Sequence, residues 1–209
     1  MWDYIFPFFC LGCNEEGTIL CYKCQATLSV LGVFVPLEKK SSLDDHIAVG
    51  LFEENNLLGK LIYAYKYNFI TATLPIFKIL IQKFLVENKN YFENVQMIVP
   101  VPLHKRRFAE RGFNQAEEIG KLLAHELNIP LQNILTRKVA TKQQAKLHKQ
   151  ERTENIKNAF ILQKGTDIKN KNIIVVDDVF TTGSTLGECA RVLKENGAGQ
   201  VRAFTLARG

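Results

Sequence analysis

The segment from Ile173 to Thr185 places an apolar strand, two acidic residues and a hydroxyl-rich turn in direct succession. Its first four residues, Ile-Ile-Val-Val, form an uninterrupted β-branched run that is typical of a strand covered on both faces. Such strands belong to parallel α/β sheets, in which ligands bind beyond the carboxyl ends of the strands. This segment therefore predicts an α/β protein with a ligand site around residues 177–185.

The residues after this strand are suited to a sugar phosphate. The run Thr181-Thr182-Gly183-Ser184-Thr185 precedes an amphipathic stretch from Leu186 to Glu195, which predicts a helix start with N–H donors, a favourable dipole and four hydroxyls. A charge-assisted hydrogen bond contributes roughly 1.5–3 kcal/mol, so several could hold a phosphate monoester against its hydration. Because Asp177 and Asp178 repel that anion, we expect them to bind sugar hydroxyls or to help hold a divalent metal.

The same segment resembles the phosphoribosyl pyrophosphate motif of type I phosphoribosyltransferases at every position. The resemblance implies that Asp177 and Asp178 bind the ribose 2′ and 3′ hydroxyls and that Thr181 to Thr185 bind the 5′-phosphate. A response-regulator receiver also ends a strand in Val-Val-Asp-Asp, but we expect too few residues after Asp177 to complete one. A buried strand and loop without a ligand is the other alternative.

Four cysteines near the N-terminus form two Cys-x-x-Cys pairs, Cys10 with Cys13 and Cys21 with Cys24. This spacing allows four thiolates to surround one tetrahedral ion, for which zinc is the natural occupant. A structural zinc contributes on the order of 10–16 kcal/mol to a segment too short for its own core. Two disulfides are the alternative, although nothing in the sequence indicates an oxidising compartment. Cys189 is interpreted as core filling.

The net charge of +6 is concentrated in one segment of the chain. Eleven Lys and Arg stand against five Asp and Glu between Val101 and Arg152, so the rest of the chain is balanced. Such an excess attracts a pyrophosphate or a nucleic-acid backbone. No apolar stretch reaches the ~18 residues of a membrane span, and the N-terminus makes a poor secretory signal, so we expect a cytoplasmic protein.

Hydrophobic periodicity divides the chain into a metal module with its connector, residues 1–45, and a main domain, residues 46–209. The predicted strands are His46–Phe52, Val95–Val101, Asn158–Leu162 and Val201–Ala207, and the predicted helices are Leu57–Tyr67, Leu74–Val86 and Phe113–Leu127. The alternation of Tyr63, Tyr65, Tyr67 and Phe69 could stack bases, but we favour packing as the commoner use of such residues. The run His104-Lys105-Arg106-Arg107 is interpreted as a basic loop for a pyrophosphate leaving group.

Several further segments closely resemble the ComF family: Ile5 to Cys13, Val99 to Pro102, Arg106 to Gln115, Gln144 to Leu147, and Arg152 to Phe160. The resemblance runs nearly end to end. It implies a type I phosphoribosyltransferase-like parallel sheet flanked by helices, with a small N-terminal zinc ribbon at Cys10, Cys13, Cys21 and Cys24. It also implies binding of 5-phosphoribosyl 1-pyrophosphate with Mg²⁺, and pyrophosphate contacts near His104 to Arg107.

That family is associated with natural transformation and the handling of incoming single-stranded DNA on the cytoplasmic side, which implies DNA-import proteins as partners. A flexible hood is expected at about 136–155, including Gln144, Leu147 and Arg152. Lys142 stands where many relatives have proline, which predicts a looser loop. We expect any acceptor to be recognised by residues before about Val95 or by the hood. A phosphoribosyltransferase of nucleobase salvage or nucleotide metabolism is the alternative function.

Overall fold

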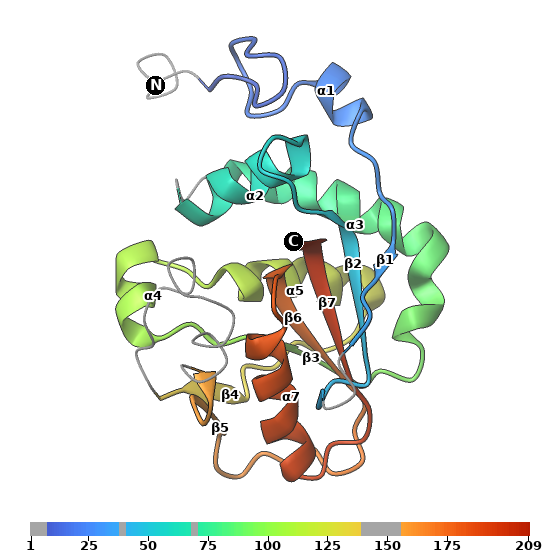
Figure 1. Cartoon of the computed structure of the whole chain (residues 1–209), viewed down its shortest axis with the longest axis vertical. Helices are drawn as coiled ribbons and strands as arrows, with labels where there is room; N and C mark the ends of the chain where they lie inside the picture. Colours follow the sequence, from blue (N-terminus) through green and yellow to red (C-terminus); the bar gives the residue numbers. More distant parts are fainter. Residues whose placement is uncertain (1–7, 38–40, 68–70, 139–155) are drawn as a thin grey trace.

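The computed structural model of this chain describes residues 8–37, 41–67, 71–138 and 156–209 (Figure 1). A five-stranded sheet in the order β1-β2-β7-β6-β3 forms its centre. Strands β2, β7, β6 and β3 are parallel, whereas β1 pairs with β2 in the antiparallel direction. The strands are β1 (Val33–Phe34), β2 (Asp45–Leu51), β3 (Met97–Pro100), β6 (Ile173–Phe180) and β7 (Val201–Arg208).

Helices and one small hairpin complete the fold. The helices are α1 (Tyr22–Ala26), α2 (Leu57–Tyr67), α3 (Leu74–Asn88), α4 (Lys105–Arg111), α5 (Gln115–Leu127) and α7 (Ser184–Glu195), with 3-10 turns η2 (Thr71–Thr73) and η3 (Lys89–Phe92). Strands β4 (Leu135–Arg137) and β5 (Phe160–Leu162) pair antiparallel as a separate two-stranded sheet. All the predicted helices and strands are present, and α2 begins and ends at the predicted residues.

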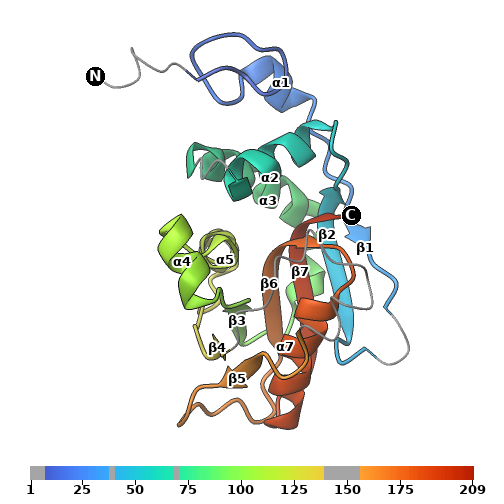
Figure 2. The same ribbon diagram turned by 60° about the vertical axis from the view of Figure 1, so that its left-hand side comes forward.

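Strand β6 is covered on both faces, as its β-branched run predicts. Ile174 and Val176 pack into the core that contains α2, α3 and α5, whereas Ile173 and Val175 pack into the core formed with α7. Figures 1 and 2 show α7 and α5 on opposite sides of the sheet. Burial of such a side chain contributes about 1.5–3 kcal/mol, so the strand that carries the acidic pair is anchored firmly.

Two local expectations need correction. Strand β6 does not end before the acidic pair but continues through it to Phe180, and Asp177 is in register with Thr205 of β7. The interpretation of residues 104–107 as a basic loop is wrong, because Lys105 begins helix α4. His104 caps this helix by accepting a hydrogen bond from the Arg106 backbone N–H at 3.2 Å. The helix forms because the run from Lys105 to Arg111 is rich in Lys, Arg, Ala and Glu, which favour helices.

The carboxyl edge of the sheet faces α2, and the cysteine module lies beyond that helix (Figures 1 and 2). The module shares the core of the main domain, since Cys10, Leu20 and Leu28 belong to the same buried cluster as Leu58 and Leu61. Strand β1, from the predicted connector, pairs with β2 at the sheet edge. Among the described residues, none of the helices combines the length and apolar character needed to span a bilayer.

Candidate ligand-binding site

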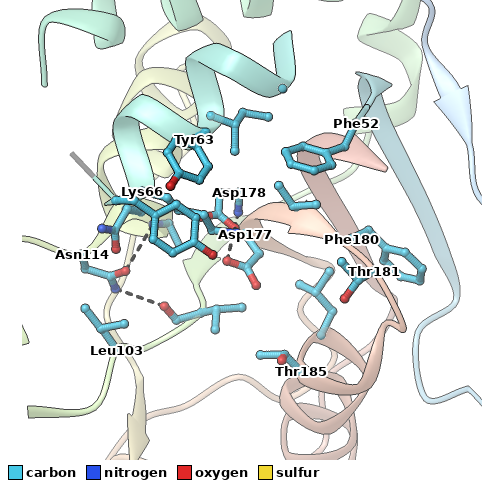
Figure 3. A pocket seen from close by; sticks show the side chains of 18 of the residues that line it. Phe52, Tyr63, Lys66, Leu103, Asn114, Asp177, Asp178, Phe180, Thr181 and Thr185 are labelled. Atoms are coloured by element: carbon cyan, nitrogen blue, oxygen red, sulfur yellow. Dashed lines mark hydrogen bonds and ion pairs between the residues drawn. The ribbon is translucent and has the colours of Figure 1, made fainter. Parts of the chain in front are cut away.

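A cavity of about 990 Å³ opens at the carboxyl edge of the sheet (Figure 3). Its walls come from the end of β6, the turn before α7, helix α2 and the segments around α4 and α5. The structure brings together in this wall every residue predicted to contact the sugar phosphate: Asp177, Asp178, Thr181, Thr182, Gly183, Ser184 and Thr185. Their position at the carboxyl ends of parallel strands is the one expected for a ligand site.

The two aspartates have different surroundings. Asp178 is 5% exposed and forms an ion pair with Lys66 of α2, whose Nζ lies 2.8 Å from Oδ1. Burial, together with the charge of Asp178, raises the pKa of Asp177 to about 7, although Lys66 opposes this effect. Asp178 is therefore paired with a lysine, while Asp177 holds a proton more readily than an ordinary aspartate because its pKa is raised.

The turn between β6 and α7 depends on Gly183. This residue has a φ of 72° and stands at the N-cap position of α7. A Cβ at this position would lie 2.6 Å from Cζ of Phe180, so both the backbone conformation and the space favour glycine. Thr182 Oγ1 and Ser184 Oγ are 2.9 Å apart, which gathers two hydroxyls at the start of the helix. This arrangement suits a phosphate dianion.

Three guanidinium groups line the cavity: those of Arg107, Arg111 and Arg137. Of the four residues predicted to contact pyrophosphate, Arg107 lies in the wall, whereas His104, Lys105 and Arg106 are not among the lining residues. The pKa of Arg107 is lowered, first by burial and then by the charge of Arg111. Because two positive groups stand close together here, this part of the cavity attracts an anion.

Sequence reasoning missed Arg111 and Arg137. Arg111 stands four residues after Arg107 on helix α4, and this spacing places both side chains on one face of the helix. The spacing alone therefore predicts that Arg111 lies near Arg107. Arg137 comes from β4.

Asn114 and Gln115 position the wall that adjoins α2. Asn114 donates from Nδ2 to the Val101 carbonyl at 3.0 Å and accepts from the Ala116 N–H at 3.2 Å, so its side chain joins the end of β3 to the start of α5. Gln115 is 3% exposed, and its Nε2 has no hydrogen-bond partner within the described part of the chain. Its backbone carbonyl accepts from the Tyr65 hydroxyl at 3.1 Å. Since Gln115 lines the cavity, its amide is an available donor for a ligand.

The aromatic residues of α2 divide into two groups. Tyr65 is fully buried, which confirms packing for this residue. For Tyr63 and Tyr67 that interpretation is wrong, because they are 56% and 48% exposed and line the cavity. Helix periodicity explains the difference, since Tyr63 and Tyr67 lie one turn apart and Tyr65 points to the opposite face. Phe69 lies outside the described residues, as do Gln144, Leu147 and Arg152 of the predicted hood.

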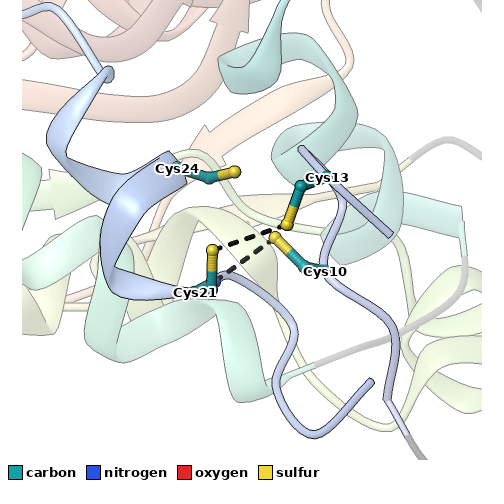
Figure 4. Close-up of side chains that lie close together, drawn as sticks. All are labelled: Cys10, Cys13, Cys21 and Cys24. Atoms are coloured by element: carbon teal, nitrogen blue, oxygen red, sulfur yellow. Dashed lines mark hydrogen bonds between the residues drawn. The ribbon is translucent and has the colours of Figure 1, made fainter. Parts of the chain in front are cut away.

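The four N-terminal cysteines converge, and all the described cysteines are free thiols (Figure 4). Their sulfur atoms lie within 4.8 Å of one another, and Cys13 Sγ is 3.6 Å from Cys21 Sγ. The edge of a zinc–thiolate tetrahedron is about 3.8 Å, so the cluster fits a metal such as zinc. Burial raises the pKa of Cys10, but N–H groups of Cys21, Cys13 and Gly12 outweigh it and lower that pKa to about 6. Cys189 is buried in the core, as predicted.

Comparisons with known proteins agree with this architecture. Residues 109–209 match the model of the phosphoribosyl transferase domain family. Competence protein ComFC of Bacillus subtilis is 34% identical over 209 residues, covering 90% of this chain and 84% of that relative. Competence protein F of Haemophilus influenzae is 39% identical over 54% of this chain, and DNA utilization protein YhgH of Escherichia coli K12 is 40% identical over 53%. The matched region spans about half the length of these two relatives, 50% and 48%.

Among solved structures, adenine phosphoribosyl transferase from Trypanosoma brucei superposes with a TM-score of 0.46 and 15% identity, over 83% of this chain and 73% of that one. The family assignment rests instead on the sequence match that extends over most of both chains. This chain belongs to the ComF family and combines a phosphoribosyltransferase-like α/β domain with an N-terminal four-cysteine module of the zinc-ribbon type.

Proposed function

We propose that the cavity binds 5-phosphoribosyl 1-pyrophosphate with Mg²⁺, and that the protein uses this ligand in natural transformation, where it handles incoming single-stranded DNA in the cytoplasm. One observation carries the proposal: a hydroxyl-rich helix start, an acidic pair and a group of guanidiniums line one cavity. These groups are complementary to the 5′-phosphate, the ribose hydroxyls and the diphosphate of the ligand.

Each wall has a defined role in this proposal. Thr181 to Thr185 hold the 5′-phosphate, and Asp177 with Asp178 accept hydrogen bonds from the ribose hydroxyls. Arg107 and Arg111 offset the charge of the diphosphate, which increases if a nucleophile displaces it. Asp177 and Asp178 would also help to hold Mg²⁺, which would neutralise part of that charge. His104, Lys105 and Arg106 lie on or beside the same short helix and would act on a longer anion outside the cavity.

The DNA part of the proposal is supported by the relatives and by charge. Two of the relatives are named competence proteins and another is named a DNA utilization protein. The excess of positive charge between Val101 and Arg152 provides a field that attracts a phosphate backbone. Zinc held by the four cysteines would stabilise the N-terminal module, whose sulfur atoms already stand at tetrahedral spacing.

The test is calorimetric titration with 5-phosphoribosyl 1-pyrophosphate, with and without Mg²⁺, on the wild type and on Asp177→Asn. This position is preferred because substitution of Asp178 would also leave Lys66 without its partner. We expect Asp177→Asn to weaken binding at least about tenfold, the loss of one charged hydrogen bond. Asp167→Asn removes the same charge at an exposed site that does not line the cavity, and should bind like the wild type.

The DNA arm uses a fluorescent single-stranded oligonucleotide over a range of salt concentrations. If the two sites are independent, Asp177→Asn should bind DNA as the wild type does. Equal loss of DNA and sugar-phosphate binding would show a shared site. Failure of the wild type to bind 5-phosphoribosyl 1-pyrophosphate under any Mg²⁺ concentration would overturn the assignment of the cavity.

A salvage phosphoribosyltransferase is the second candidate, because Tyr63 and Tyr67 offer an aromatic surface in the same cavity. Release of pyrophosphate on addition of a free purine or pyrimidine base would favour it. Release that requires single-stranded DNA would favour a role in transformation instead.

A further inference from the structure

Lys66 brings a positive charge to the acidic pair from a distant part of the chain. Its Nζ lies 2.8 Å from Oδ1 of Asp178, and the two side chains are 25% and 7% exposed. In Figure 3 the acidic pair stands between Lys66 and the side chains of Thr181 and Thr185. The ammonium group therefore approaches the carboxylates from the side opposite to the phosphate turn.

The packing of α2 fixes the position of this ammonium group. Lys66 stands in the last turn of the helix, where the helix dipole favours a cation. Leu61, Ile62 and Tyr65 of the same helix are fully buried. The Tyr65 hydroxyl also donates a hydrogen bond to the Gln115 carbonyl at 3.1 Å, which ties α2 to α5. Because the helix is anchored, the charge of Lys66 is held beside the acidic pair before any ligand arrives.

The three charged side chains influence one another. Burial alone would lower the pKa of Lys66, but the charges of Asp178 and Asp177 outweigh burial and raise that pKa. Lys66 in turn opposes the increase in the pKa of Asp177. The ammonium group thus offsets one of the two carboxylate charges, so a phosphate in the cavity is repelled less.

The ion pair also affects where a divalent cation can bind. Oδ1 of Asp178 already accepts a hydrogen bond from the ammonium group, so a metal ion at this oxygen would have to displace Lys66. Because α2 is anchored, the displaced ammonium would stay close to the metal ion, and the two positive charges would repel each other. The other oxygen of Asp178 remains an acceptor for a ribose hydroxyl.

We propose that Lys66 is the internal counter-ion of the acidic pair, so that ribose 5-phosphate binds without a divalent cation and Mg²⁺ enters only with a diphosphate. The inference rests on the proposed function, because the acidic pair and the turn at Thr181 to Thr185 must hold the ribose and the phosphate. Lys66 is a positioning residue here, since it acts on the ligand through the carboxylates. The remaining oxygens of the acidic pair would help to hold the Mg²⁺ that accompanies the diphosphate.

Titration calorimetry on the wild type compares two ligands, each with a chelator and with millimolar Mg²⁺. Ribose 5-phosphate should bind equally well in both conditions, because Lys66 already supplies the countercharge. 5-Phosphoribosyl 1-pyrophosphate should bind more tightly with Mg²⁺, because the cation then accompanies the diphosphate. A ribose 5-phosphate affinity that increases about tenfold or more with Mg²⁺ would overturn the counter-ion, whether or not any variant folds. Equal affinity for 5-phosphoribosyl 1-pyrophosphate in both conditions would overturn the entry of Mg²⁺ with the diphosphate.

Lys66→Met removes the counter-ion, and circular dichroism checks that the variant is folded. Without Mg²⁺ its affinity for ribose 5-phosphate should fall at least about tenfold, as for the loss of one charged interaction. Millimolar Mg²⁺ should restore much of that affinity, which a purely structural role of the lysine does not predict. Lys78→Met is the matched control, because it removes an ion-paired lysine of α3 that does not line the cavity. This control should bind ribose 5-phosphate as the wild type does in both conditions.

An unchanged affinity of Lys66→Met without Mg²⁺ would contradict the inference. A loss of affinity in folded Lys66→Met that Mg²⁺ does not reduce would also overturn it, because the lysine would then act only on the structure. Absence of ribose 5-phosphate binding by the wild type in both conditions would show instead that the proposed function is wrong, and this inference would be lost with it.

Discussion

Substitution of Gly183 by alanine tests the structure of the phosphate-binding turn. Alanine in a left-handed conformation costs about 1–2 kcal/mol, and Gly183 has a φ of 72°. The added Cβ would also lie 2.6 and 2.8 Å from two atoms of the Phe180 ring. Overpacking of this kind costs about 1–3 kcal/mol. The two contributions together predict a loss of about 2–5 kcal/mol in the free energy of unfolding.

The Phe180 ring has little freedom to move away. It stacks on His46 with centroids 4.3 Å apart and planes inclined by 19°. His46 is itself buried, and its Nε2 lies 2.9 Å from the Thr205 hydroxyl oxygen. Relief of the clash would therefore disturb a packed group on three strands. Because the turn must shift, we expect the affinity for ribose 5-phosphate to fall at least about tenfold, as for the loss of one charged hydrogen bond.

Two other glycines serve as matched controls. Gly112 has a φ of 78°, but a Cβ there would meet no atom within 4 Å, so Gly112→Ala should lose only about 1–2 kcal/mol for the backbone. Gly187 lies inside α7 with equal space and without a positive φ, so Gly187→Ala should gain about 0.5–1 kcal/mol. Urea unfolding followed by circular dichroism compares all three. Equal midpoints for Gly183→Ala and Gly112→Ala would refute the argument from Phe180.

The remaining predictions concern the ion pair, the acidic pair and the cysteines. Lys66→Met should lower the free energy of unfolding by about 1–3 kcal/mol in urea, because Asp178 is left buried without its partner, and an unchanged midpoint would contradict this. The pKa of Asp177 is raised from 3.8 to about 7, so the folded protein favours the protonated side chain. The contribution of Asp177 to the free energy of unfolding is therefore largest below pH 3.8 and is lost as the pH rises to about 7. Asp177→Asn should flatten the pH dependence of stability over this range, by no more than about 4 kcal/mol. Removal of metal with a chelator should lower the melting temperature of the zinc-loaded protein, and Gly12→Ala should weaken metal binding because its Cβ would lie 2.6 Å from Cys24 Sγ.

The parts of the site predicted from sequence are those encoded in contiguous residues. The strand, the acidic pair and the turn at Gly183 follow one another along the chain, and local periodicity is sufficient to identify α2 with its correct ends. The cysteine cluster was predictable for the same reason, since the spacing of two Cys-x-x-Cys pairs specifies a tetrahedral site without any knowledge of the fold.

The missed parts depend on contacts between distant segments. Lys66 stands within a tyrosine-rich helix, and only the packing of α2 above β6 brings its ammonium group to Asp178. Arg137 comes from β4 of the separate hairpin, so its place in the cavity wall depends on tertiary structure. Tyr63 and Tyr67 could have been separated from Tyr65 by applying a period of 3.6 residues to a helix that had already been predicted.

Helix α2 links the metal module to the ligand cavity. At its start, Leu57 packs with Cys21 and Cys24 against the common core, and Lys60 Nζ lies 3.4 Å from the carbonyl oxygen of Leu11. Leu11 also lines the cavity with Tyr63. The last turn of the same helix supplies the lysine that balances the acidic pair. Because one rigid helix carries both sets of contacts, disorder in the cysteine module would disturb the aromatic wall first, whereas the phosphate turn, held between β6 and α7, would be affected least.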